Sequence, residues 1–464
     1  MIAPTHRRRL FVVVVVVVSA TLLTSDRAWA FDLPGPDAAA LGQGGAVVAS
    51  PYVVSGCVLN PALLGLHPRT LRISAGVTVD SRRAVTRRLG YGPETTAEAT
   101  PEPSALPMAV AVGSLGVYSL FAGAWYVERG GARAEFPGKD PNDPLTPSQW
   151  DRQRYGALRY RLRRHHFGLG LAWRPLPWLS IGVGIGGQWI SLEHSRMISF
   201  TQGDDDAAER LQNDVQSTVK LKDEFVPVGL FGVFLRPWKP LRLGLSFELP
   251  GGAKLTGSGT LTQSGPYPNA RVLIGEAAAS LRLPLPWVLR VGLGVDVWRF
   301  AIDVSGTVTG APPTRGLVAD AKGLLVQPNA GQTEVFPMEI LPLGVVLRRQ
   351  FTLSFGLRVA ILPRVLHLSA GYAFAQGETH PAYRTAALVA PDRHLATVGV
   401  SIQHKALRLD VAYARVIAST HSGTSKAFQT NLVEPSVSTN IGASRQRLDG
   451  DLIALTLSVD LALR

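Results

Sequence analysis

Cysteine is almost absent from this chain of 464 residues, and the single thiol, Cys57, cannot form an intramolecular disulfide. Metal-binding patterns are scarce as well: the sequence holds no H-E-x-x-H or C-x-x-C, and His165-His166 has no partner at metal spacing. The two histidines are interpreted as exposed residues where a loop meets a strand. No metal and no cofactor are predicted. No Ser–His–Asp set can be assigned by spacing, so the chain is not expected to be an enzyme.

Long apolar runs are missing beyond residue 30. Before it, Arg7–Arg9 precede the apolar stretch from Leu10 to Leu23, and Ala28-Trp29-Ala30 fits a cleavage pattern. A spanning helix needs about 20 apolar residues, so residues 1–30 are predicted to be a cleaved signal peptide, with Phe31 as the first mature residue. Farther along, Gly, Arg, Asp or Ser interrupts every apolar stretch, which argues against a bundle of spanning helices.

The periodicity beyond residue 70 is two rather than 3.6. In residues 351–361, for example, Phe351, Leu353 and Phe355 alternate with small or polar residues. Strict alternation over ten or more residues gives one apolar and one small or polar face, as in a transmembrane β-barrel with lipid outside and a lumen inside. The alternating segments are 70–80, 105–114, 116–127, 154–174, 178–199, 215–237, 241–262, 272–296, 298–309, 336–361, 365–376, 393–404, 407–419 and 449–463.

The sequence therefore predicts an all-β fold, a transmembrane antiparallel β-barrel of about fourteen strands over residues 70–464. Internal prolines in 272–296 and 336–361 could divide these two segments, which leaves sixteen strands open. Short turns such as 236–240 and 405–406 alternate with long polar stretches, and the former are expected to be periplasmic and the latter extracellular. The long stretches are 128–153, 200–214, 263–271, 310–335, 377–392 and 420–448.

Three local patterns have a structural interpretation. Gly182–Gly187 fits G-x-G-x-x-G, but its glycines occupy the inward positions of an alternating strand. Asp204–Asp206 reads as a solvated loop. Arg159, Arg161 and Arg163 share one face of a strand. Farther along the same strand, the apolar residues move to the face that the arginines occupy here. The three arginines form either a basic track near a pore mouth or, as we favour, a strand extension above the bilayer that touches lipopolysaccharide phosphates.

Residues 31–69 are rich in Gly and Ala and do not alternate. They are too apolar to hang free in the periplasm, so a hatch that fills the lumen is predicted. Gly42, Gly44 and Gly45 would let the backbone pack closely against the wall. Asn60 would satisfy backbone groups that otherwise lack partners, and Pro61 would fix the turn into the first strand.

The chain resembles the long-chain fatty-acid transporter family of outer-membrane proteins, the FadL and TodX type. The resemblance rests on A-x-x-L-G-x-G-G-A at Ala38–Ala46, on Asn60-Pro61-Ala62, and on Pro391–His394 leading into 395–401. It implies a fourteen-stranded barrel with an N-terminal hatch, and passive uptake of long-chain fatty acids or aromatic hydrocarbons. It also implies that Phe31 and residues 60–62 belong to the elements that rearrange during transport.

The expected function is diffusion-driven uptake of hydrophobic small molecules across the bacterial outer membrane by a monomer. Two alternatives stay open: a structural or adhesive barrel that conducts nothing, and a barrel enzyme. The net charge is +13, a value that could suggest nucleic acid. Because the arginines are spread through strands and loops, outer-membrane lipid and lipopolysaccharide are the expected partners instead.

Overall fold

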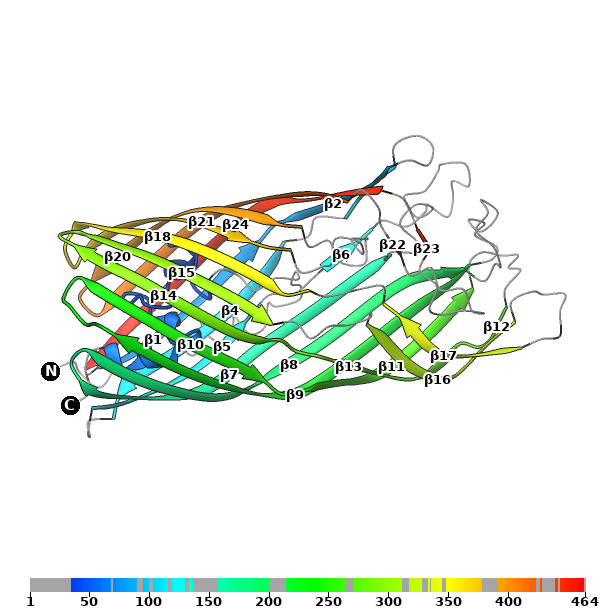
Figure 1. Ribbon diagram of the computed structural model, residues 1–464, viewed down its shortest axis with the longest axis horizontal. Helices are drawn as coiled ribbons and strands as arrows, with labels where there is room; N and C mark the ends of the chain where they lie inside the picture. Colours follow the sequence, from blue (N-terminus) through cyan, green and yellow to red (C-terminus); the bar gives the residue numbers. More distant parts are fainter. Residues whose placement is uncertain are drawn as a thin grey trace, which may run out of the picture.

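A computed structural model shows a closed antiparallel barrel with one short-turn end and one long-loop end (Figure 1). The structure describes residues 35–67, 70–89, 95–99, 103–115, 119–129, 133–136, 157–199, 214–263, 271–310, 317–327, 333, 335–343, 348–377, 391–422, 426–427, 439–440 and 443–462. The predicted signal peptide and much of the predicted long loops lie outside these residues.

Fourteen staves make up the wall, and several of them consist of two or three strands placed end to end. In ring order they are β1 (Thr70–Asp80) with β2 (Arg83–Leu89), β3 (Thr95–Glu98) with β4 (Ser104–Ser114), β5 (Leu120–Glu128) with β6 (Arg133–Glu135), β7 (Arg159–Leu176), β8 (Leu179–Ser199), β9 (Asp214–Leu235), β10 (Leu241–Pro250) with β11 (Ala253–Gln263), β12 (Arg271–Ile274) with β13 (Glu276–Leu283) and β14 (Trp287–Val297), β15 (Phe300–Gly310) with β16 (Val318–Gln327), β17 (Phe336–Pro342) with β18 (Gln350–Leu362), β19 (Leu366–Ala375), β20 (Arg393–His404), β21 (Leu407–Ser422) and β24 (Ala443–Ala462).

Pairing of β1 with β24 closes the ring, with Thr70 opposite Ala462 and Asp80 opposite Leu452. The segments 272–296 and 336–361 do break near their prolines, but their pieces stay on the same stave, so the count is fourteen and not sixteen. A short sheet of β22 (Lys426–Ala427) and β23 (Thr439–Asn440) lies apart from the wall.

Several predicted loops are wrong in detail. Residues 318–327 form β16, which pairs with β12, β13 and β17, although the sequence placed them in a loop. The strands β2, β3 and β6 were not predicted at all, and β24 begins at Ala443 rather than at 449. These pieces extend the wall beyond the long alternating segments, where the alternation of apolar residues is weak.

The outward face of the wall carries an apolar band. On β7, Leu169, Leu171 and Trp173 are 61, 52 and 50% exposed, whereas Ala172 between them is buried. Such alternation is the pattern of strands with lipid on one side and a filled lumen on the other. Tryptophans mark the short-turn end, where Trp178, Trp238 and Trp298 are exposed.

Toward the long-loop end the polarity of the two faces inverts. The inward side chains there are apolar and buried, and they form one cluster that includes Leu192, Leu221 and Leu255. Their neighbours on the outward face are polar or charged, such as Lys220 and Lys222. This inversion explains why the apolar residues in the sequence change from one face of the strand to the other. Toward the long-loop end the strands extend beyond the outward apolar band, and their apolar side faces the lumen.

Two local interpretations can be compared with the structure. Gly182–Gly187 lies within the strand β8, and β9 follows it rather than a helix. The histidine interpretation was wrong: His165 and His166 are 4 and 0% exposed, inside β7. Among the described residues no helix is long and apolar enough to cross a membrane.

Candidate functional site

Residues 35–67 lie inside the barrel near its short-turn end (Figure 1). Their elements are α2 (Ala38–Leu41), η1 (Val54–Val58) and η2 (Pro61–Leu66). They touch staves around the ring: the Ala38 amide donates to Thr456 Oγ1 at 3.0 Å, and Ser180 Oγ donates to the Ala62 carbonyl at 2.7 Å. We call this segment the hatch. Phe31, the first residue of the predicted mature chain, lies outside the described residues.

Asn60 ties the hatch to itself and to the wall. Its Oδ1 accepts from the Ala62 amide at 3.1 Å, as a cap for η2, and Pro61 takes the first helical position. Its Nδ2 donates to the Val48 carbonyl at 2.9 Å and to the Val233 carbonyl of β9 at 3.3 Å. The side chain is fully buried, so these bonds satisfy backbone groups that water cannot reach.

Glycines allow the hatch and the wall to approach each other. Gly44 has φ +61°, and a Cβ there would lie 2.8 Å from the Tyr372 amide nitrogen. At Gly42 a Cβ would meet Ser369 Oγ at 2.6 Å, while Gly45, φ +79°, borders the cavity described below. Inward glycines of the wall leave matching space for the hatch backbone, at Gly182, Gly232, Gly244, Gly292, Gly356 and Gly371.

Arginines from the wall hold the hatch at the short-turn end. Arg242, which is fully buried, donates through Nη1 to the Ala49 carbonyl at 2.8 Å and to Asp303 Oδ1 at 2.9 Å. Arg408 donates to the Tyr52 carbonyl at 2.9 Å. The Tyr52 ring lies 5.2 Å from the Arg242 guanidinium carbon and 4.5 Å from that of Arg358, which suits cation–π contact.

Asp37 begins the hatch helix α2. Its carboxylate accepts from the Ala40 amide at 2.7 Å and is 3% exposed. Burial, together with the nearby Asp410, raises the pKa of the Asp37 carboxyl to about 6. The hatch therefore contains one acid whose charge state changes in the mildly acidic range.

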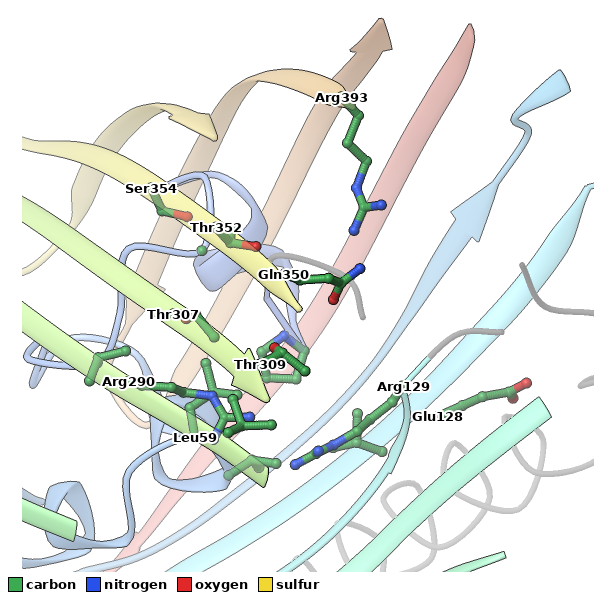
Figure 2. Close-up of a pocket in the computed structure, with 16 residues that line it drawn as sticks. Leu59, Glu128, Arg129, Arg290, Thr307, Thr309, Gln350, Thr352, Ser354 and Arg393 are labelled. Atoms are coloured by element: carbon green, nitrogen blue, oxygen red, sulfur yellow. The ribbon is translucent and has the colours of Figure 1, made fainter. Parts of the chain in front are cut away.

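A cavity of about 100 Å³ lies where the hatch meets the wall, on the side away from the short turns (Figure 2). Val48, Val58 and Leu59 of the hatch give it an apolar side. The wall lines it with cationic and hydroxyl side chains together with an acid, an amide and two valines: Val127, Glu128, Arg129, Val288, Arg290, Thr307, Thr309, Gln350, Thr352, Ser354 and Arg393. We call this cavity the chamber.

The chamber contains hydrogen-bond donors that lack an acceptor. Arg290 is 4% exposed and donates through Nη2 to Glu248 Oε2 at 2.7 Å, and Arg129 also donates to Glu248. Among the described residues, Arg290 Nη1 and Gln350 Nε2 are buried without a partner. Arg290 Nη1 therefore offers a charged donor inside the chamber, and an anionic acceptor would be stabilised there.

Alternation predicts a small or polar face on the lumen side of the strands, but it does not predict these arginines in a chamber. Arg290 was not singled out, although its place between Leu289 and Val291 on an alternating strand indicates an inward side chain. Its partner Glu248 lies on β10, 42 positions away, so no local pattern could reveal the cluster. Within the described residues no group of side chains is arranged to hold a metal.

Solved structures share this fold over almost the whole chain. A Pseudomonas aeruginosa FadL homologue superposes with a TM-score of 0.71 at 19% identity, covering 93% of this chain and 99% of that one. The P. putida toluene transporter TodX gives 0.68 at 14%, covering 93 and 100%. The Ralstonia pickettii toluene transporter TbuX gives 0.64 at 15%, covering 93 and 99%.

The similarity is visible in three dimensions and not in family-level sequence comparison. No protein-family model matches the chain, and no curated protein matches it. At identities of 13 to 19%, the structural likeness establishes the barrel fold. Two of the three structures are named as toluene transporters.

Proposed function

We propose that the chain is an outer-membrane channel of the FadL type, which passes hydrophobic small molecules inward by diffusion, and that its ligands carry a carboxylate. The chamber is the observation that supports this most directly. Its apolar side, formed by Val48, Val58 and Leu59, suits a hydrocarbon tail, and the unpaired Arg290 Nη1 suits an anionic head. Long-chain fatty acids have both parts, whereas a pure hydrocarbon has no acceptor to offer.

The rest of the barrel supports a path for such a ligand. The buried apolar cluster at the long-loop end, with Leu192, Leu221 and Leu255, would take the ligand from the outer surface. Burying apolar area is favourable by about 25 cal/mol per Å², so the step needs no energy source. The hatch blocks the lumen beyond the chamber, and passage requires it to move from its seat near Asn60.

The proposed function requires one orientation of the barrel in the outer membrane. The short-turn end, with its tryptophans, is periplasmic, and the long-loop end is extracellular. The chain works as a monomer after removal of residues 1–30. It has no catalytic part in the process, and its ligand leaves chemically unchanged.

Binding measurements on the purified protein test the ligand class. A long-chain fatty acid should bind at least about tenfold more tightly than its methyl ester, because a hydrogen bond between charged groups contributes about 1.5–3 kcal/mol. In Arg290→Gln this preference should shrink toward unity, while Arg129 still pairs with Glu248. Equal affinity of the wild type for acid and ester would contradict a carboxylate site, and no binding of either would contradict the uptake function.

A further inference from the structure

The strands β7, β8 and β9 are much longer than a membrane requires. They contain 18, 21 and 22 residues, whereas about 9–11 residues cross the hydrocarbon layer. Their remaining parts extend toward the long-loop end (Figure 1), beyond the outward apolar band. The outward face of this projection is not used by the uptake path, which runs through the lumen.

An aromatic layer ends the apolar band on this side of the barrel. Phe167 and Phe225 are 36 and 58% exposed, with ring centroids 6.0 Å apart. At the next outward position of β7, His165 stacks on Trp189 at 4.6 Å and bonds the Tyr126 hydroxyl at 2.8 Å. Such rings are typical of the level where hydrocarbon gives way to head groups.

Cations follow directly above the aromatic layer. Strand register places Arg163 and Lys222 on either side of Ser191, and Arg161 and Lys220 on either side of Glu193. The lysine side chains are 66% exposed at Lys220 and 62% at Lys222. On the neighbouring staves Lys254 lies opposite Arg282, and both are exposed. We call these six residues the cationic face.

Acids on the cationic face balance only part of its charge. Glu193 lies within 3.9 Å of Arg161 and Lys220, and Glu224 bonds Lys222 at 2.7 Å. Asp223 accepts from two backbone amides, those of Phe225 and Lys254. Farther out, Glu135 and Glu193 both bond Arg159, and Glu276 lies opposite Thr260. Even with Arg163 left out, these acids number three against five cations, so the outward face here keeps a net positive charge.

We propose that the cationic face binds the phosphate groups of a phosphorylated, acylated glycolipid of the outer leaflet, of the lipid A kind. Its acyl chains lie along the apolar band below Phe167, its sugar ring meets Trp189 of the aromatic layer, and its phosphates reach Lys222, Lys254 and Arg282. The succession of apolar, aromatic and cationic layers matches the three parts of this lipid. The inference rests on the proposed outer-membrane location, but not on transport.

Native mass spectrometry of the full protein in detergent tests the site with two defined probes: bis-phosphorylated lipid A, and the same lipid A after removal of its phosphates. The phosphorylated form should bind at least about tenfold more tightly, and rising salt should weaken it because exposed charges are screened. Equal binding of both forms to the wild type would overturn the proposal without any variant.

A matched pair of triple variants then locates the site. Lys222→Gln, Lys254→Gln and Arg282→Gln together should weaken binding of the phosphorylated form by at least about tenfold. Lys239→Gln, Arg364→Gln and Lys405→Gln remove the same charge from exposed positions of the short turns and should leave it unchanged. Fatty-acid binding in the chamber should survive in both variants. Undiminished lipid binding in the first triple variant would place the lipid elsewhere and overturn the proposal.

Discussion

Individual side chains hold the hatch through hydrogen bonds that are not part of helix or strand pairing. Arg242 and Arg408 donate to the backbone carbonyls of Ala49 and Tyr52, and Asn60 reaches the wall at Val233. Each bond serves a polar group that is shielded from water, so losing it costs more than forming it contributes. The hatch is therefore seated by these bonds together with apolar packing, in which Val58 and Leu64 belong to one buried cluster with Trp125 of the wall.

Removing the Asn60 side chain should loosen the hatch. Asn60→Ala leaves the buried carbonyl of Val48 without its donor at 2.9 Å, a loss worth about 1–3 kcal/mol. Single-channel recordings should show more frequent openings, while the barrel still runs as a heat-modifiable band on gels. Ser81→Ala, which removes one exposed bond to the Asp451 carbonyl, is the control and should record like the wild type. Equal opening frequency in all three proteins would show that Asn60 does not seat the hatch.

The raised pKa of the Asp37 carboxyl predicts that the stability of the seated hatch depends on pH. Its pKa in the seated hatch is about 6, against 3.8 as the ordinary value. The seated form therefore holds its proton over a range in which a displaced form loses it. This stabilisation is complete below the ordinary pKa and is lost as the pH rises through about 6.

Openings should accordingly become about tenfold more frequent between pH 5 and pH 7, since one pKa unit corresponds to 1.36 kcal/mol. Asp37→Asn can still accept from the Ala40 amide and should lose this dependence. Recordings at both pH values decide the matter. A pH dependence that persists unchanged in Asp37→Asn would assign it to another group.

At the scale of the element, the alternation of apolar with small or polar residues predicted the staves of the wall. The prediction of strands failed in segments where this alternation is weak. In β18, Phe351, Phe355 and Leu357 are 42, 43 and 37% exposed, as their period of two requires. In β16 the run Val318-Ala319-Asp320-Ala321-Lys322 offers only small or charged residues, so its strand pairing was invisible. Along β7 the sequence shows that the apolar residues change from one face of the strand to the other. The cause of this change, an apolar upper lumen, could be seen only in the structure.

The same strand should tolerate an arginine differently on its two faces. Leu357→Arg puts a charge into lipid, which costs roughly 2–4 kcal/mol near mid-bilayer, whereas Thr352→Arg adds one to the polar wall of the chamber. The first variant should assemble poorly, and the second should assemble like the wild type. Heat-modifiable protein in isolated outer membranes measures this, and equal yields would argue against the assignment of faces.

At the scale of the whole molecule, the barrel and the hatch have different roles. The wall provides an apolar outside and an apolar upper lumen, and the hatch lies in the lumen near the short-turn end, where Asn60 bonds the wall. Sequence patterns placed the hatch between the predicted signal peptide and the first strand, because residues 31–69 are apolar without alternating. They could not predict the chamber, whose lining comes from staves far apart in the chain.

Deletion of residues 35–58 should leave a barrel that assembles but no longer closes. Wall pairing from β1 to β24 does not involve the hatch backbone, so the closed ring should persist. Planar-bilayer recordings should show a steady conductance, in contrast to the closed full-length protein. If deletion and full-length protein were equally closed, the segment would not be the barrier.

Uptake by intact cells tests the central claim most directly. Cells that lack their own fatty-acid channel are given this protein, and entry of a labelled long-chain fatty acid is compared with entry of a polar solute of similar size. The account predicts that the full-length protein raises fatty-acid entry above that of empty cells, that it leaves polar entry unchanged, and that Arg290→Gln reduces the gain. Fatty-acid entry no faster than in empty cells, with the barrel assembled in the outer membrane, would contradict it and favour a non-conducting barrel.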